Sequence, residues 1–228
     1  MKKIAGIVSL AVTLFALFTL PAHAAWVIVD AGHTPGRPGA TAANGRVEHE
    51  YNLDLSAVVA RDLEARGDTV TRTGAGRQEI GLADRPNAAP DANLFVSIHH
   101  DSLQQAWIDT GHARDYRGFA VFVSAKNPFY EQSLACARQI AARLVAAGET
   151  PSLYHATPIQ GENRPLIDRG LGIHRFDDLV VLRTAPMPAV LVEAGVIVNP
   201  DEAVRLQDGR VVGGLGKAIS DGILECGR

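Results

Sequence analysis

The sequence predicts a single α/β domain, built on a mostly parallel or mixed twisted sheet of about six strands with helices on both faces. Short apolar runs of strand length alternate along the chain with longer segments of helical period. The chain of 228 residues shows no internal repeat and no change of composition. Its length suits one buried core, so we expect one folded domain over residues 25–228.

Residues 1–24 are predicted to be a signal peptide rather than part of that domain. Two lysines precede an uncharged run over residues 4–20, and a small-residue cleavage site ends at Ala24. The apolar run is slightly longer than the usual core of a signal peptide, so an uncleaved membrane anchor is the alternative. We expect cleavage, with no stable membrane insertion of the mature chain afterwards.

Charge and cysteine content restrict the remaining function classes. The formal charge is −3 and no cluster of lysines or arginines is present, which argues against nucleic acid as a partner. Cys136 and Cys226 are the only cysteines. An exported chain can join them in a disulfide, and two separate buried thiols are the equal alternative.

The predicted elements follow from local patterns in chain order. The first strand, residues 26–29, is a short apolar run that ends just before Asp30 and His33. A helix over residues 48–66 follows, with apolar residues on one face and Gly67 at its end. The later strands are predicted over residues 69–73, 94–99, 118–124, 179–182 and 189–192. Later helices are predicted over residues 128–147 and 211–224, and another begins at Pro200 after an Asn199 cap. Residues 82–93 are predicted to form a short helix or an irregular link.

Three residue types that bind metals recur at the predicted carboxyl ends of strands. His33, His99 and Glu193 each follow or end an apolar run, and ligands bind at that edge of open α/β sheets. Glu48 lies at the start of the first helix. Two imidazoles and one carboxylate would suit a catalytic zinc ion, and a second carboxylate could act as general base. Taken alone, such residues are also common as capping or solvated groups.

Four segments surround these residues: IVDAGHTPGRPGA, EHEYNLDLSAVVARDLEARG, FVSIHHDS and VVLRTAPMPAVLVEAGVIVNPDEAVRL. In this order they resemble the zinc-dependent N-acetylmuramoyl-L-alanine amidases of the amidase 3 type. The resemblance runs from Val27 nearly to the C-terminus and implies one zinc ion held by His33, Glu48 and His99, with Glu193 as the catalytic glutamate. It identifies no substrate-binding residue.

Several positions near these elements have alternative interpretations. Glu48 is preferred to Glu50 as the ligand because it lies four residues before Asn52, as in the family's helix start. His100 should point away from His99, since neighbours on a strand face opposite sides, with a substrate contact as the lesser alternative. His49 and Glu50 are predicted to be solvated, and His112, His155 and His174 are predicted to be exposed loop residues. Residues 103–117 are predicted to form a surface insertion. Residues 148–169 are predicted to form a mobile rim loop without a blocking helix. Arg183 could pair with a substrate carboxylate or with a structural one.

The resemblance implies a peptidoglycan hydrolase that cleaves the amide bond between N-acetylmuramic acid and L-alanine of the stem peptide by zinc-activated water. The alternatives are a zinc peptidase or carboxypeptidase acting on stem peptides and, in another class, a non-catalytic wall-binding regulator. The expected partners are peptidoglycan or muropeptide fragments, and the resemblance also allows a protein activator. We expect a monomer in the periplasm, with secretion to the extracellular space as the alternative.

Overall fold

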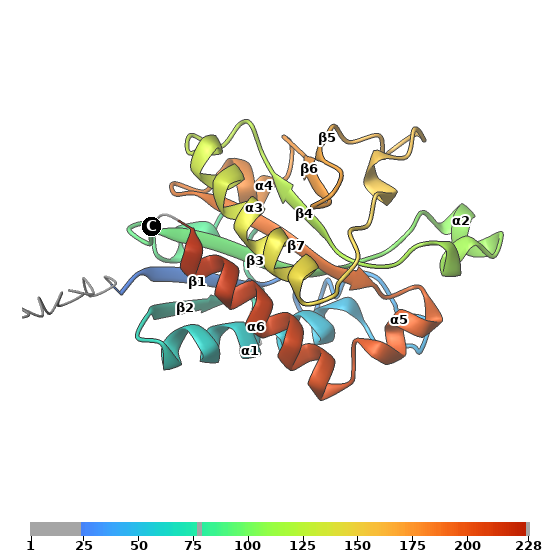
Figure 1. Cartoon of the computed structure of the whole chain (residues 1–228), viewed down its shortest axis with the longest axis horizontal. Helices are drawn as coiled ribbons and strands as arrows, with labels where there is room; N and C mark the ends of the chain where they lie inside the picture. The colour runs from blue at the N-terminus through green and yellow to red at the C-terminus, as the bar shows by residue number, and fades with distance from the viewer. Residues whose placement is uncertain (1–23, 77–78, 227–228) are drawn as a thin grey trace, which may run out of the picture.

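The computed structural model describes residues 24–76 and 79–226, and these residues form one seven-stranded sheet in the order β2-β1-β3-β7-β4-β6-β5 (Figure 1). The predicted signal peptide lies outside the described residues except for Ala24. The strands are β1 (Trp26–Ala31), β2 (Thr69–Thr73), β3 (Leu94–Asp101), β4 (Ala120–Val123), β5 (Leu166–Asp168), β6 (Ile173–Arg175) and β7 (Ala189–Val196). The helices are α1 (Glu48–Ala65), α2 (Gln105–Asp109), α3 (Tyr130–Ala146), α4 (Val180–Arg183), α5 (Pro200–Arg205) and α6 (Gly209–Glu225).

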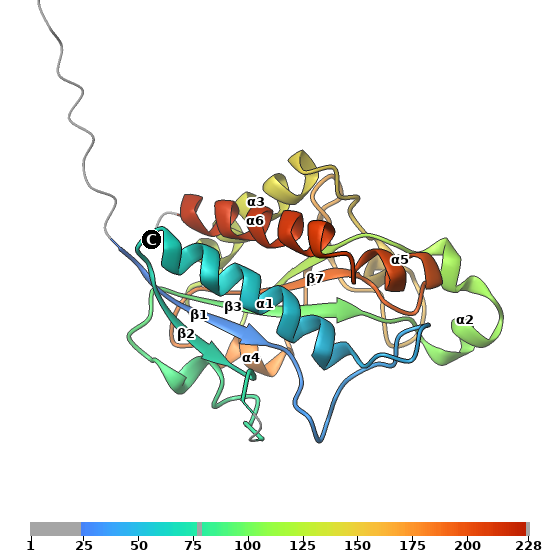
Figure 2. The same ribbon diagram turned by 90° about the horizontal axis from the view of Figure 1, so that it is seen from below.

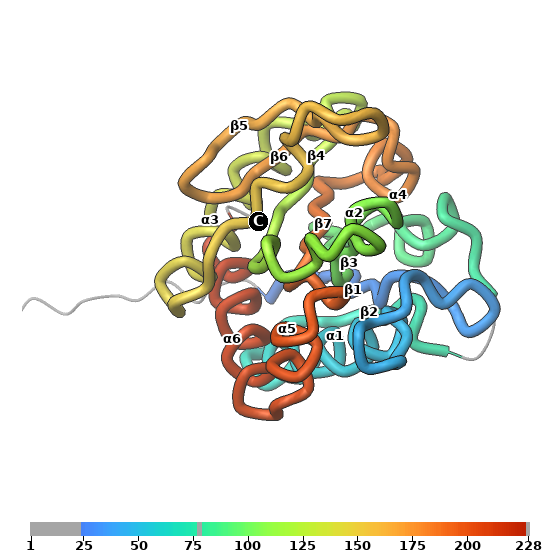
Figure 3. The backbone as a smooth tube through the Cα atoms, turned by 90° about the vertical axis from the view of Figure 1, so that its right-hand side faces the viewer, coloured from blue at the N-terminus to red at the C-terminus, as the bar shows by residue number. Residues whose placement is uncertain are grey.

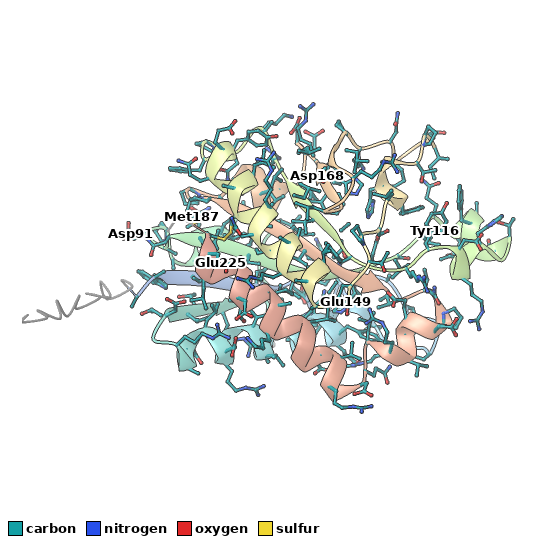
Figure 4. The ribbon with its side chains drawn as sticks, in the orientation of Figure 1. Asp91, Tyr116, Glu149, Asp168, Met187 and Glu225 are labelled. Atoms are coloured by element: carbon teal, nitrogen blue, oxygen red, sulfur yellow. A yellow bond between two sulfur atoms is a disulfide. The ribbon has the colours of Figure 1, made fainter. Side chains whose placement is uncertain are left out.

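Strand direction decides where chemistry can gather. β2, β1, β3 and β7 run parallel, whereas β4 lies antiparallel to β7 and β5 antiparallel to β6. The carboxyl ends of the parallel strands therefore meet at one edge, which faces the viewer in Figure 3 together with α2 and α5. Figure 4 marks the two edges, with Tyr116 beside α2 at this edge and Asp91 and Met187 toward the opposite edge.

Helices cover both faces of the sheet, which confirms the predicted fold class. The helices α1, α3 and α6 pack on one face (Figure 2), where alternate strand residues such as Val29 and Ile98 join the main core. The other face is covered by α4 and connecting segments, and Ile28 and Phe95 are buried there. Successive strand residues thus alternate between two apolar layers, as the pleat requires.

The strand predicted over residues 179–182 is wrong, because this segment is the helix α4. A short apolar run does not distinguish a buried strand from a buried helical turn. Val181 and Leu182 bury their side chains against the second face of the sheet, and Asn127 Nδ2 donates to the carbonyls of Leu182 and Met187. The sequence also missed β5 and β6, which are three residues each, so the sheet has seven strands rather than six.

The predicted helices over residues 48–66, 128–147 and 211–224 correspond to α1, α3 and α6 within two residues at each end. The Asn199 cap is confirmed, because its side chain accepts hydrogen bonds from the N–H groups of Asp201 and Glu202. Among the described residues, no helix combines the length and the apolar character needed to cross a bilayer.

Cys136 on α3 and Cys226 at the end of α6 form a disulfide, with their Cα atoms 4.6 Å apart. The structure therefore decides between the two alternatives left open by the sequence. The bond joins the two helices whose faces lie together on the sheet. It closes a loop with a sequence separation of 90 residues, and a cross-link of that span restricts the unfolded chain.

Candidate metal centre

His33, Glu48 and His99 come together at the carboxyl edge of the sheet. His33 lies in the loop after β1, Glu48 opens α1, and His99 lies on β3. His33 Nε2 is 2.9 Å from Glu48 Oε2, and His99 Nδ1 is 3.0 Å from Glu48 Oε1. One ligand atom from each residue lies within 4.8 Å of the others, which is the only such cluster among the described residues.

The backbone around the cluster is shaped to let these side chains meet. His33 has φ +68°, a left-handed conformation that is uncommon for a non-glycine residue and is typical of strained functional positions. Gly39 has φ +79°, and a Cβ there would collide with the Glu48 carboxylate and the His33 ring. A Cβ at Gly32 would collide with the His99 ring. Larger residues at either glycine would therefore displace the cluster.

Strand alternation separates the two adjacent histidines. The side chain of His99 reaches the Glu48 carboxylate. The side chain of His100 lies on the opposite face of the strand, where it is buried against α1 and its Nδ1 is 2.8 Å from Asn52 Oδ1. Burial lowers the pKa of His100 to about 3, so its ring is neutral at physiological pH. His100 thus points away from the cluster, as the alternation predicts.

Local contacts orient Glu48 rather than Glu50 toward the histidines. Asn52 Nδ2 and the Ala40 N–H donate to the two oxygens of Glu48, at 3.3 and 3.2 Å. Burial opposes ionisation of Glu48, but hydrogen bonds from His33 and His99 outweigh it and lower the pKa of the carboxyl group. Glu50 is exposed and pairs with Arg46 at 3.1 Å.

The prediction that His49 is solvated is wrong. The residue is 4% exposed, and its Nδ1 lies 2.8 Å from the Gly32 carbonyl oxygen. Its ring therefore packs beneath the loop that carries His33. A histidine that follows the first residue of a helix gives no local sign of this contact, since the partner lies 17 positions away.

Glu193 lies on β7 directly opposite His99 of β3, on the same face of the sheet. Its Oε2 is buried and has no hydrogen-bond partner among the described residues. Burial raises the pKa of this carboxyl group well above its ordinary value, and the negative charges of Asp101 and Glu48 raise it further. A carboxyl group tuned in this way beside a cluster of metal-binding residues is suited to accept and return a proton.

A buried ion pair between Arg85 and Asp30, which has no signature in the sequence, lies beneath the His33 loop. Arg85 is 1% exposed, and its Nη1 donates to Asp30 Oδ1 at 2.7 Å and to the Ala31 carbonyl at 2.9 Å. Its Nη2 donates to the His33 carbonyl at 2.5 Å. Thr73 and Ser97 also donate to the Asp30 carboxylate. Arg85 therefore ties the irregular segment before β3 to the backbone of His33.

We expect Arg85→Met to lower the free energy of unfolding by about 3–5 kcal/mol, because it leaves the Asp30 carboxylate buried without its countercharge. Urea unfolding of the variant measures this loss. The double variant Asp30→Asn/Arg85→Met should lose less than the sum of the two single variants, since their effects are coupled. A single variant within about 1 kcal/mol of the original chain would contradict the assignment.

The rim segment over residues 148–169 carries a second group that sequence analysis missed. His155 donates through Nε2 to Asp101 Oδ2 at 2.8 Å and through Nδ1 to Glu162 Oε2 at 2.9 Å. Burial disfavours its charged form, but the two carboxylates outweigh burial and raise the pKa of His155 to about 10. His155 is therefore an imidazolium that fastens the segment to the end of β3. The prediction that it is exposed is wrong.

The predictions for His112 and His174 differ in outcome, and both loop segments agree with prediction. His174 is fully buried on β6, so its predicted exposure is also wrong, whereas His112 is exposed as predicted. Between residues 148 and 169 the structure has a 3₁₀ turn at Tyr154–Ala156 and β5, with no blocking helix, as predicted. Residues 103–117 are exposed or half-buried except Leu103, in line with a surface insertion.

The charge of His155 makes a pH-dependent contribution to stability. Its ordinary pKa is near 6.5 and its folded pKa is about 10, so the stabilisation is complete below about pH 6.5 and is lost as the pH rises through 10. Between these values, a chain with His155 should lose up to about 1.4 kcal/mol of unfolding free energy per pH unit more than the His155→Gln variant. Urea unfolding at pH 7, 8 and 9 measures both slopes. Equal slopes would show that His155 is not charged in the folded chain.

Comparison with known proteins places the chain in a family. Residues 27–225 match the Amidase_3 family model, described as N-acetylmuramoyl-L-alanine amidase. The chain is 28% identical over 201 residues to the N-acetylmuramoyl-L-alanine amidase LytC of Bacillus subtilis, covering 86% of this chain. It spans 34% of the length of LytC.

Solved structures share the fold. The catalytic domain of CwlV, an N-acetylmuramoyl-L-alanine amidase from Bacillus (Paenibacillus) polymyxa var. colistinus, matches with a TM-score of 0.68 and 27% identity over 87% of this chain and 96% of that chain. An N-acetylmuramoyl-L-alanine amidase from Clostridium difficile 630 matches with a TM-score of 0.70 and 23% identity over 88% and 95% of the two chains, a likeness of fold alone. With the family match over nearly all of the described residues, the chain belongs to the Amidase_3 family of N-acetylmuramoyl-L-alanine amidases.

Proposed function

We propose that this chain hydrolyses the amide bond between N-acetylmuramic acid and the L-alanine of the peptidoglycan stem peptide, with one zinc ion held by His33, Glu48 and His99. The donor set supports zinc, because two imidazole nitrogens and one carboxylate oxygen are the ligands of many catalytic zinc sites. Both imidazoles already face the same carboxylate at 2.9 and 3.0 Å. Three protein ligands leave a coordination position open for water or substrate.

The side chains around the cluster account for the other needs of amide hydrolysis. When bound, zinc activates water and polarises the scissile carbonyl group. Glu193 takes the proton from the attacking water and delivers it to the leaving amine of L-alanine, which otherwise would depart as an unstable anion. Its position opposite His99 and its raised pKa support this role. Asn52 and the Ala40 N–H keep Glu48 oriented, and Arg85 holds the His33 loop.

The juxtaposition of the His33–Glu48–His99 cluster with the unpaired carboxyl oxygen of Glu193 is the observation that carries this proposal. Digestion of purified peptidoglycan with and without a zinc chelator tests it. The expected products are peptides with a free N-terminal L-alanine, formed only when the metal is present. Release of single residues from the carboxyl ends of stem peptides would instead identify a zinc carboxypeptidase.

We also propose that residues 1–24 are removed on export and that residues 25–228 act in the periplasm. The disulfide between Cys136 and Cys226 supports this, because such bonds persist in oxidising compartments and are rare in the cytosol. N-terminal sequencing of the exported protein should begin at Ala25. A membrane-bound product that retains residues 1–24 would favour the uncleaved anchor.

A further inference from the structure

A pocket of about 270 Å³ opens beside the metal-binding cluster, and His33 and His99 form part of its wall. The rest of the wall differs in chemistry from the cluster. Ile80, Leu82 and Val181 supply its apolar part. Its polar groups come from Thr34, Arg37 and Arg85 and from the carboxylates of Asp30 and Glu79. A bound group in this pocket would therefore lie next to the bond that the cluster hydrolyses.

Arg37 is presented to this pocket by a tight turn. The N–H groups of Thr34 and Arg37 each donate to the other's carbonyl, at 3.2 and 3.1 Å. Glu79 fixes the turn from outside, since its carboxylate accepts from the Thr34 hydroxyl at 2.5 Å and from the Gly36 N–H at 2.9 Å. The turn begins at the residue after His33, so the position of Arg37 is coupled to the cluster.

Arg37 is exposed, and its guanidinium group has no hydrogen bond or ion pair within the described part of the chain, whereas both Nη atoms of the buried Arg85 are hydrogen-bonded. The charge of Arg37 acts on Glu79, but both carboxylate oxygens of Glu79 are already engaged by the turn. Asp30, the other carboxylate of the wall, is engaged as well, since it accepts from Arg85, Thr73 and Ser97. Both carboxylates of the pocket are therefore already hydrogen-bonded, and neither is committed to Arg37.

Charge complementarity selects the peptide side of the substrate for this pocket. In the proposed substrate the lactyl carboxyl group is consumed in the scissile amide, so the sugar side brings no charge. The stem peptide beyond L-alanine carries carboxylates. Guanidinium groups bind carboxylates through charge-assisted hydrogen bonds in well-matched geometry.

We propose that this pocket binds the start of the stem peptide, with Arg37 recognising the free carboxylate of an acidic second residue. The inference rests on the proposed function. The apolar wall of Ile80, Leu82 and Val181 suits the methyl group of L-alanine. The volume lies near the lower end for small-molecule sites and accommodates a short peptide segment rather than a continuing glycan strand.

A matched pair of substrates tests this role. Zinc-loaded protein is assayed on a muramyl dipeptide whose second residue carries a free α-carboxylate and on the same compound with a carboxamide in its place. Arg37→Gln should lower kcat/KM for the acid by roughly 10- to 100-fold, mainly through KM, because a hydrogen bond to a charged group is lost. For the carboxamide the change should stay within about threefold. Arg37→Lys should restore part of the preference for the acid.

Arg61→Gln is the matched control, since Arg61 is exposed on α1 and its side chain has no hydrogen bond or ion pair with any described residue. Equal losses on both substrates with Arg37→Gln would overturn the inference and leave Arg37 as a residue of the turn. Selective loss of the acid with Arg183→Gln instead would also overturn it. Arg183 lies on α4 but does not line the pocket.

The same assay distinguishes failure of the amidase proposal from failure of the Arg37 proposal. If the zinc-loaded protein cleaves neither substrate, the amidase assignment fails. Calorimetric binding of the dipeptide L-alanyl-D-glutamate and of its α-carboxamide then still decides the role of Arg37. Tighter binding of the acid that Arg37→Gln abolishes supports the pocket, whereas equal binding of the two dipeptides contradicts it.

Discussion

Replacement of Glu193 by glutamine should lower kcat on peptidoglycan by roughly 10²- to 10⁴-fold while leaving the zinc content unchanged. Glutamine has nearly the volume of glutamate and keeps one oxygen, but it cannot accept and return a proton. Glu193 is not one of the three clustered residues, so the metal should remain. The measurements are turnover on purified wall and zinc content by elemental analysis of the same preparation.

Glu50→Gln is the matched control for this variant. Glu50 is exposed on α1 and pairs with Arg46, and exposed pairs contribute little to stability. We expect normal turnover and normal zinc content in Glu50→Gln. A Glu193→Gln enzyme with full activity would remove Glu193 from the mechanism. Loss of zinc from Glu50→Gln would show instead that the metal-binding carboxylate is Glu50 and that the assignment of Glu48 is in error.

Substitution of His99 by alanine should weaken zinc binding by more than about 100-fold, because even the loss of a group that only supports a metal ligand costs 10–100-fold. The Nδ1 atom of His99 lies 3.0 Å from Glu48 Oε1, so its removal leaves two of the three clustered side chains. Competition of the purified protein with a chromophoric chelator measures the affinity. Circular dichroism checks that the variant is folded.

The neighbouring variant His100→Gln should bind zinc within about tenfold of the original chain, since His100 faces α1 and contacts Asn52. Its main effect should be on stability, because the ring is buried and hydrogen-bonded. The two variants therefore distinguish the two possible registers of β3. If His99→Ala retained zinc and His100→Gln lost it, the register assigned to β3 would be wrong by one residue.

The elements best predicted from sequence are those with a local cause. The helix α1 carries apolar residues at helical spacing, and Asn199 precedes Pro200 and two acidic residues in an ordinary capping pattern. Strand alternation also assigns His99 and His100 to opposite faces without any coordinates. In contrast, α4 was predicted as a strand, because its short apolar run lacks the length at which the period becomes decisive.

The α/β class, the order of the main elements and the four candidate site residues follow from the sequence alone, because each depends on local periodicity or on a quoted motif. Three contacts depend on the folded structure: Arg85 supports His33, His155 is charged between two carboxylates, and Arg37 lines the pocket beside the cluster. Arg85 and Asp30 are 55 positions apart, and His155 and Asp101 are 54 apart. Such pairs arise from folding of the sheet, and no pattern within either segment records its partner.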